Sequence, residues 1–225
     1  QFGQAQIMGQ TLRETMADST RELLKLGGNM TDVLNTQKQV SEALGRNVVI
    51  SSETSKDLFA SMKVTGQSVK EIVDGMANVG VSSINAANEM KKVVDVARES
   101  GVNAEAVSSK VLTNMEALNK YNFEGGVSGL AKMAAQATAL RIDMSQTLNF
   151  AEKVFNPEGA IEVAAAMQRL GVAQSDLLDP LRMMDLSQND PAELQNQITQ
   201  MSKQFVQMGK DGHFEIMPGA KRQLR

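Results

Sequence analysis

Residues 125–171 decide the fold class of this chain, and they read GGVSGLAKMAAQATALRIDMSQTLNFAEKVFNPEGAIEVAAAMQRLG. Apolar residues recur at every third or fourth position in three successive runs, which is the spacing of one face of an α-helix. Asn156 is a predicted N-cap, Pro157 takes the first helical position, and Gly171 ends the last run. We therefore expect three short helices whose inward faces are, in order, Leu130, Met133, Ala134, Ala137 and Leu140; Met144, Leu148, Ala151 and Phe155; and Ile161, Ala164, Ala165, Met167 and Leu170.

The same order of cap, apolar stripe and glycine extends toward the N-terminus. Ser68 and Glu71 have the spacing of a capping box, in which each side chain accepts a backbone N–H of the other. Residues 48–50 are a buried connector or an edge strand, because so short an apolar run does not distinguish them. Helices are expected over 4–26 (Leu12, Met16, Leu23 and Leu26 inward, interrupted at Ser19), 31–45 (capped by Thr31, Leu34 inward), 52–66, 68–80, 82–101 (Ile84 inward) and 103–118.

Toward the C-terminus, a short helix begins at Ser175 or Asp176 and is kinked or restarted at Pro180. Asp190 and Pro191 start another helix, predicted to reach Gly209. Its apolar seam is too short for an independent coiled coil and favours packing within this chain; it comprises Leu194, Ile198, Met201, Phe205 and Met208. A turn over 210–213, a short strand over 214–217 and a last helix from Pro218 are expected after it.

These patterns predict an all-α fold of roughly nine or ten short capped helices, packed as hairpins or a bundle. The only β structure expected is a short segment near 214–217. The loop over 119–126, rich in Asn and Gly, is the expected boundary between an N-terminal helical segment, 1–120, and a helical subdomain, 121–225. Because the chain opens without Met and its last residues look helical, we expect a piece of a longer polypeptide.

Composition narrows the classes of function. The 225 residues carry a formal net charge of −3 and include no cysteine, so neither a broad basic surface for nucleic acid nor a thiolate metal site is expected. No apolar run has the length of a membrane span. With 15 Met, 7 Phe, 1 Tyr and no Trp, the core is expected to pack loosely and to melt in a low, broad transition.

No residue is predicted to be catalytic, to bind a cofactor or to bind a metal. His213 lacks convergent partners and is interpreted as a turn residue. The glycines before residue 130 do not match a phosphate-binding spacing, and they indicate a hinge or close packing. The other groups that we considered have ordinary structural interpretations: dipole partners at helix starts (Asp143, Glu152, Glu158, Glu162), core (Met183, Met184) and a solvated helix end (Lys221, Arg222, Arg225).

Three segments, GLAKMAAQA (129–137), IDMSQTLNFAEKV (142–154) and NPEGAIEVAAAMQRLG (156–171), resemble phage tail tape-measure proteins. The likeness covers the middle and last thirds of the chain, to about 214–218. It implies a largely helical, non-enzymatic virion protein that is assembled in the host cytoplasm and lies in the tail lumen or tail tip. Such a protein sets tail length during assembly and leaves through the tail on DNA ejection. The implied partners are other copies of the chain in a symmetric oligomer and tail tube, tail tip or baseplate proteins, with no specific nucleic-acid binding.

Three other readings remain open. An internal, ejected protein of a short-tailed phage has the same composition. A helical adaptor module requires longer heptad runs than the glycines here allow. A lysozyme-like domain, which some tape measures carry, requires a glutamate in a cleft with aromatic subsites, and the middle of the chain is poor in aromatic residues. The short helices also depart from the long uninterrupted rods of the tape-measure family.

Overall fold

The structure is a computed structural model that describes residues 2–169, 172, 175–203, 206–208 and 214–216, with side chains over 12–169, 172 and 175–202. Within these residues it contains twelve α-helices, one 3-10 helix and one pair of short strands, so the all-α prediction is confirmed. The chain forms two compact units. Unit 1 comprises residues 1–116 and 134–140, and unit 2 comprises residues 117–133 and 141–225. The chain passes from unit 1 into unit 2 after residue 116, close to the loop expected over 119–126. One helix, over residues 127–140, contributes to both units.

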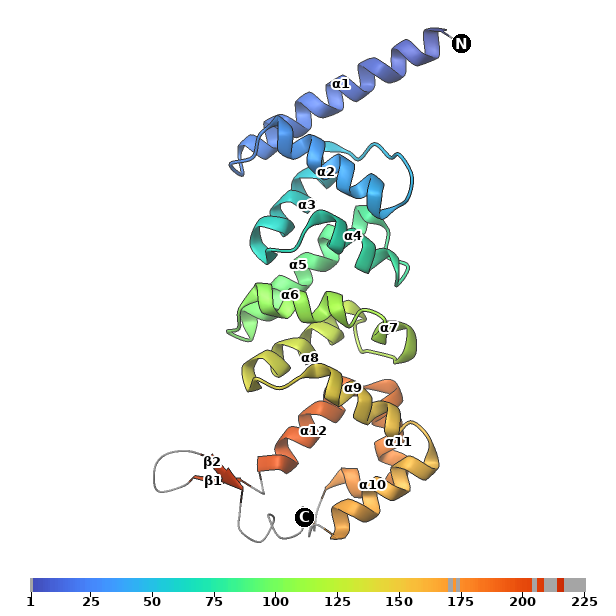
Figure 1. Cartoon of the computed structure of the whole chain (residues 1–225), viewed down its shortest axis with the longest axis vertical. Coiled ribbons are helices and arrows are strands. Elements are labelled where there is room, and N and C mark those ends of the chain that lie inside the picture. Colours follow the sequence, from blue (N-terminus) through green and yellow to red (C-terminus); the bar gives the residue numbers. More distant parts are fainter. Residues whose placement is uncertain (1, 170–171, 173–174, 204–205, 209–213, 217–225) are drawn as a thin grey trace. The chain divides into compact units, whose positions relative to one another are not determined.

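Unit 1 is built from helical hairpins that follow one another along the chain (Figure 1). Helix α1 packs on α3, α2 packs on α4, and α3 packs on α5, so that each hairpin rests on the next. The core lies between these helices and includes Leu58, Phe59, Ile72 and Met90, all fully buried. The bounds are α1 Phe2–Leu24, α2 Met30–Ala43, α3 Ser52–Thr65, α4 Val69–Ala77, α5 Ser83–Glu99 and α6 Ala104–Thr113.

Local signals set the helix starts in unit 1. The Ser68 Oγ accepts the Glu71 N–H at 3.2 Å and the Glu71 carboxylate accepts the Ser68 N–H at 2.8 Å, which confirms the capping box. Helix α2 is capped by Asn29, whereas Thr31 was predicted. The Asn29 side chain accepts the N–H groups of Thr31 and Asp32, and the Asp32 carboxylate accepts the Asn29 N–H at 2.8 Å. Helix α1 has ended just before it, where the Gly28 N–H donates to the Leu23 carbonyl.

Glycine in the left-handed conformation follows the ends of α4 and α5. Gly80 has φ +79°, and the N–H of the next residue, Val81, donates to the Met76 carbonyl at 2.9 Å. Gly101 repeats the arrangement, with the Val102 N–H on the Ala97 carbonyl at 3.0 Å. This is the Schellman geometry, which satisfies the last helical carbonyls and turns the chain back within a few residues.

Several side chains predicted to face inward in unit 1 do not. Leu26, Leu34 and Ile84 are exposed, with Ile84 at 66%. Ser19, predicted to interrupt the α1 stripe, is instead buried, as is Leu23 one turn later. Each of these helices carries apolar residues on more than one side, and the position of the neighbouring helix selects the side that is buried. Residues 48–50 form a connector rather than a strand.

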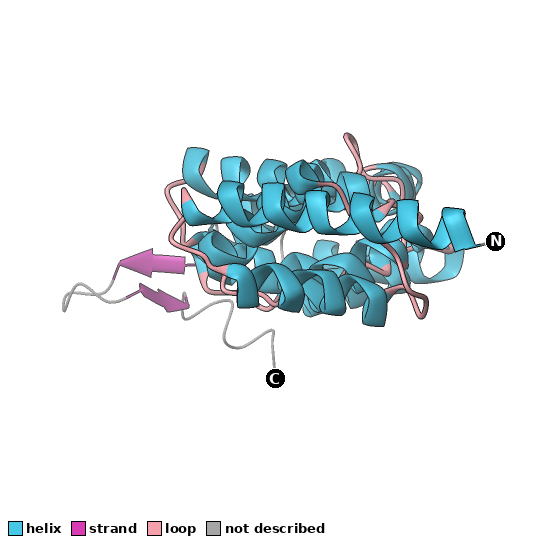
Figure 2. Ribbon diagram, turned by 90° about the horizontal axis from the view of Figure 1, so that it is seen from above, coloured by secondary structure: helices cyan, strands magenta, loops and turns pink. Residues whose placement is uncertain are grey.

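Unit 2 contains shorter helices and the two strands. The bounds are α7 Ala117–Lys120, α8 Val127–Leu140, α9 Met144–Lys153, α10 Pro157–Arg169, the 3-10 helix η1 Asp176–Leu178, α11 Pro180–Asn189, α12 Pro191–Lys203, β1 Val206–Met208 and β2 Phe214–Ile216. Residues 134–140 of α8 belong to unit 1. The restart at Pro180 is confirmed, because the Asp179 side chain accepts the Leu181 N–H at 2.9 Å and caps α11. The two strands run antiparallel (Figure 2). Val206 lies opposite Ile216 in their register.

Other predictions for this region need correction. On α10 the buried residues are Ala160, Val163, Ala164 and Met167, whereas Ile161 and Ala165 are exposed. Leu140 and Phe155 are also more exposed than predicted, at 39% and 44%. Helix α12 ends at Lys203 and Met208 lies in β1, so the predicted seam does not continue as helix. Leu170, Gly171, Phe205, Gly209, the turn over 210–213 and the helix from Pro218 lie outside the described residues.

Candidate functional site

The acidic residues considered from the sequence lie at separate helix ends and in ion pairs. The Asp143 side chain accepts the Ser145 N–H at 3.0 Å and caps α9. Glu152 pairs with Lys120 at 3.8 Å and Glu162 with Lys153 at 3.2 Å, while Glu158 is exposed in the first turn of α10. Among the described residues, no group of three His, Cys, Asp or Glu side chains is placed to hold a metal ion. His213, Lys221, Arg222 and Arg225 lie outside them.

The glycines and methionines have structural positions. Gly125 and Gly126 adopt positive φ in the turn before α8. A Cβ atom on Gly129 would lie 2.4 Å from the Glu124 carbonyl oxygen, so a close backbone approach requires glycine there. Met183 is fully buried and Met184 half-buried in unit 2.

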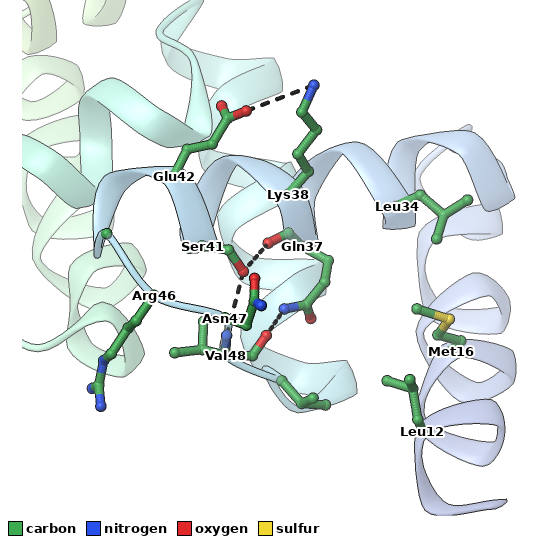
Figure 3. Close-up of a pocket in the computed structure, with 12 residues that line it drawn as sticks. Leu12, Met16, Leu34, Gln37, Lys38, Ser41, Glu42, Arg46, Asn47 and Val48 are labelled. Carbon is green, nitrogen blue, oxygen red and sulfur yellow. Dashed lines mark hydrogen bonds and ion pairs between the residues drawn. The ribbon is translucent and has the colours of Figure 1, made fainter. Parts of the chain in front are cut away.

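An open groove in unit 1 is the candidate interaction site. It encloses about 690 Å³ between α1, α2 and the connector over 45–49. Figure 3 shows Leu12 and Met16 of α1 facing Leu34 of α2 across it. Leu34 and Val49 are 46% and 62% exposed, so apolar surface is in contact with water. The lining residues also include Gln37, Lys38, Ser41, Glu42, Arg46, Asn47 and Val48.

Gln37 fixes the connector that forms one wall of this groove. Its amide nitrogen donates to the Val48 carbonyl, and its amide oxygen accepts the Ile50 N–H at 3.2 Å. In an extended chain the C=O of one residue and the N–H of the residue two positions later point to the same side. The Gln37 carboxamide therefore pairs with the connector as a neighbouring strand would. The Ser41 hydroxyl adds a bond from the Val48 N–H at 3.4 Å (Figure 3).

The rim of the groove is charged and the floor is apolar. Lys38 and Glu42 form an exposed ion pair at 3.6 Å, one turn apart on α2, and Arg46 adds a positive charge. An apolar floor inside a polar rim is the arrangement found in many protein–protein interfaces. The sequence did not indicate this site, since the pairing of Gln37 with residues 48 and 50 depends on how the connector folds back.

In unit 2, Tyr121 is the titratable group with the most distinctive surroundings. Its ring packs edge-on against Phe123 and Phe155, at centroid distances of 6.5 and 6.4 Å. Its hydroxyl donates to the Leu148 carbonyl at 3.3 Å. Burial, assisted by the negative charge of Glu152, raises the pKa of Tyr121 above its ordinary value. The group is a packing element between α7 and α9.

Comparison with known proteins adds no relative, because no family model, curated protein or solved structure matches this chain. No described helix has both the length and the apolar character that crossing a membrane requires.

Proposed function

We propose that this chain is a segment of a phage tail tape-measure protein, a structural virion protein that sets tail length and leaves through the tail on DNA ejection. The observation that carries the proposal is the likeness of residues 129–171 to that family. These residues correspond to three consecutive helices, α8, α9 and α10, with Asp143 capping the second and the Asn156 side chain accepting the Gly159 N–H at 2.9 Å to begin the third.

The way in which unit 1 is held together is compatible with this role. Most of its helices contact only helices close to them in sequence, and the sequence contains no cysteine that could staple distant segments. Structures with contacts of this kind open and reform segment by segment. A protein that is packed during assembly and dismantled for ejection benefits from that property.

The α1–α2 groove is where we place a contact with another virion polypeptide. Another copy of the chain is one such partner, because contents of a tail are expected to follow its rotational symmetry. Tail tube, tail tip and baseplate proteins are others. The apolar floor with Leu34 and Val49 exposed supports a protein partner over a nucleic acid.

An internal, ejected protein of a short-tailed phage is the second candidate. The shortness of the helices favours it, since apart from the 23-residue α1 no described helix exceeds the 17 residues of α5. A compact protein carried in a capsid needs no long rods.

Fractionated virions and an in-frame deletion test the proposal. In the phage that encodes this chain, we expect its peptides in purified tails by mass spectrometry. Removing about 100 helical residues should shorten the tail by at most about 150 Å, the length of one continuous helix at 1.5 Å per residue, and by less where the helices fold back as hairpins. Peptides found only in the capsid of a phage with no tail tube support the second candidate. Absence of the peptides from virions refutes both.

A further inference from the structure

The connector between α2 and α3 contains a short extended segment that runs beside α2. The carboxamide of Gln37 bonds the C=O of Val48 and the N–H of Ile50. The Ser41 hydroxyl accepts the Val48 N–H at 3.4 Å (Figure 3). Side chains of α2 therefore occupy one edge of this segment, the edge toward which the backbone groups of residues 48 and 50 point.

The opposite edge of the segment has no partner. Backbone groups alternate along an extended chain, so Asn47, Val49 and Ser51 direct their N–H and C=O groups away from α2. Within the described residues, the backbone of Asn47 and that of Val49 form no hydrogen bond. Ser51, with φ −66° and ψ 161°, continues the extended segment as far as the cap of α3. An unpaired backbone edge of this kind can accept a further strand.

The side chain at the middle of this edge is apolar and in contact with water. Val49 is 62% exposed and is part of the lining of the groove between α1 and α2. On an added strand, the residue opposite Val49 would place its side chain on the same face of the ladder. Pairing would therefore remove Val49 from water as well as satisfy its backbone.

The two ends of the segment carry opposite charges. Arg46 precedes it, and Glu53 follows it in the first turn of α3; both are exposed. When two copies pair antiparallel about Val49, residue 46 of one lies opposite residue 52 of the other, because each is three residues from 49. Arg46 then lies close to the partner's Glu53, and the two-fold axis repeats this contact at the other end. Such complementarity favours a second copy of the chain over an unrelated strand.

We propose that the connector pairs with the same connector of a second copy, in a two-fold antiparallel β-ladder centred on Val49. Val49 exchanges both backbone hydrogen bonds with the partner's Val49, and Asn47 does so with the partner's Ser51. The inference rests on the interaction site that the proposed function assigns to this groove, and it names the partner. So short a ladder buries less than the roughly 1,200 Å² of a standard interface, so the dimer is weak and forms where copies are held close together.

Sedimentation velocity of the full chain, between about 10 µM and about 1 mM, tests the proposal. The unmodified protein should show a reversible equilibrium between monomer and dimer. Val49→Pro removes the N–H at the two-fold axis and should weaken the dimer by about 30-fold or more. Val49→Thr is the matched control, because it keeps the N–H and the branched side chain, and its dissociation constant should stay within about fivefold of the unmodified value. Circular dichroism shows whether each variant keeps its helices.

Two charge reversals test the two-fold register. Arg46→Glu and Glu53→Arg each place like charges together at both ends of the ladder, and each should weaken the dimer by about 30-fold. An equimolar mixture of the two variants restores opposite charges at both ends and should associate again, which misfolded variants would not do. This mixture decides the question even if Val49→Pro unfolds.

Restored association in the mixture, with each reversal variant monomeric alone, supports the proposal. It is overturned if the unmodified protein stays monomeric at every concentration, or if folded Val49→Pro or the reversal variants associate as the unmodified protein does. It is also overturned if the mixture of folded reversal variants stays monomeric. Absence of the chain from virions would refute the proposed function and leave this equilibrium unchanged, so the two failures are distinguishable.

Discussion

Replacing Gly159 by alanine should destabilise unit 2, although alanine is the better helix former. Gly159 lies in the first turn of α10, where the chain has just left α9 through residues 154–156. A Cβ atom there would lie 1.9 Å from the Lys153 carbonyl oxygen, and Cβ atoms essentially never approach other atoms within 3.0 Å. The alanine therefore forces a movement of about 1.1 Å between two backbone segments.

The expected magnitude follows from two opposing effects. Alanine in a helix is favoured over glycine by about 1 kcal/mol. Overpacking costs about 1–3 kcal/mol, and the upper end applies because a backbone carbonyl cannot rotate away as a side chain can. The free energy of unfolding should fall by about 2 kcal/mol. Urea denaturation followed by circular dichroism at the helical band measures it.

Two control variants separate the clash from helix propensity. Ala165→Gly, at an exposed position of the same helix, should cost about 1 kcal/mol by propensity alone. Gly75→Ala in α4 brings the new Cβ atom to 3.0 Å from a methyl group of Leu112, a side chain that can turn aside. It should change stability by less than about 1 kcal/mol. The reasoning is refuted if Gly159→Ala is as stable as the unmodified protein or more stable.

Three further predictions concern single side chains. Tyr121 is the only tyrosine and there is no tryptophan, so the absorbance of tyrosinate reports the raised pKa of this residue directly. The contribution of Tyr121 to the free energy of unfolding should be full below the unfolded pKa of about 10 and should fall as pH rises toward the higher folded pKa. A titration midpoint in the native protein equal to that in denaturant contradicts this. Ser108 Oγ is buried without a partner, so Ser108→Ala should raise the free energy of unfolding by about 0.5–1 kcal/mol. Thr65→Val is the control and should lower the free energy of unfolding, because it removes a buried hydroxyl that donates to the Ser61 carbonyl at 2.7 Å. A lower free energy of unfolding in Ser108→Ala would exclude an unpartnered hydroxyl. Hydrogen bonds from the Ser68 hydroxyl and N–H lower the pKa of Glu71. The stabilising effect of Glu71 should therefore be present above the unfolded pKa of about 4.3 and disappear as pH falls through the folded pKa. Glu71→Gln should make the free energy of unfolding less dependent on pH in this acidic range, and an unchanged dependence would count against the cap.

The beginnings and ends of many helices could be predicted from the sequence alone. Ser68 with Glu71, Asn103, Pro180 with its preceding aspartate, and the glycine at 101 act through hydrogen bonds or backbone preferences that span a few residues. The all-α class followed from the same signals. Their partners are close in sequence, so the information needed to predict them is close as well.

Which face of each helix is buried depended on the tertiary structure. On α10 the stripe through Ile161 and the stripe through Val163 both have helical spacing, and only the position of the neighbouring helices leaves the first exposed and buries the second. Gln37 became part of a site because the connector folds back onto α2, and Gly159 became indispensable because the Lys153 carbonyl lies against it. Such contacts depend on how successive elements turn back on one another, and the spacing of residues along a single helix does not determine how the chain turns.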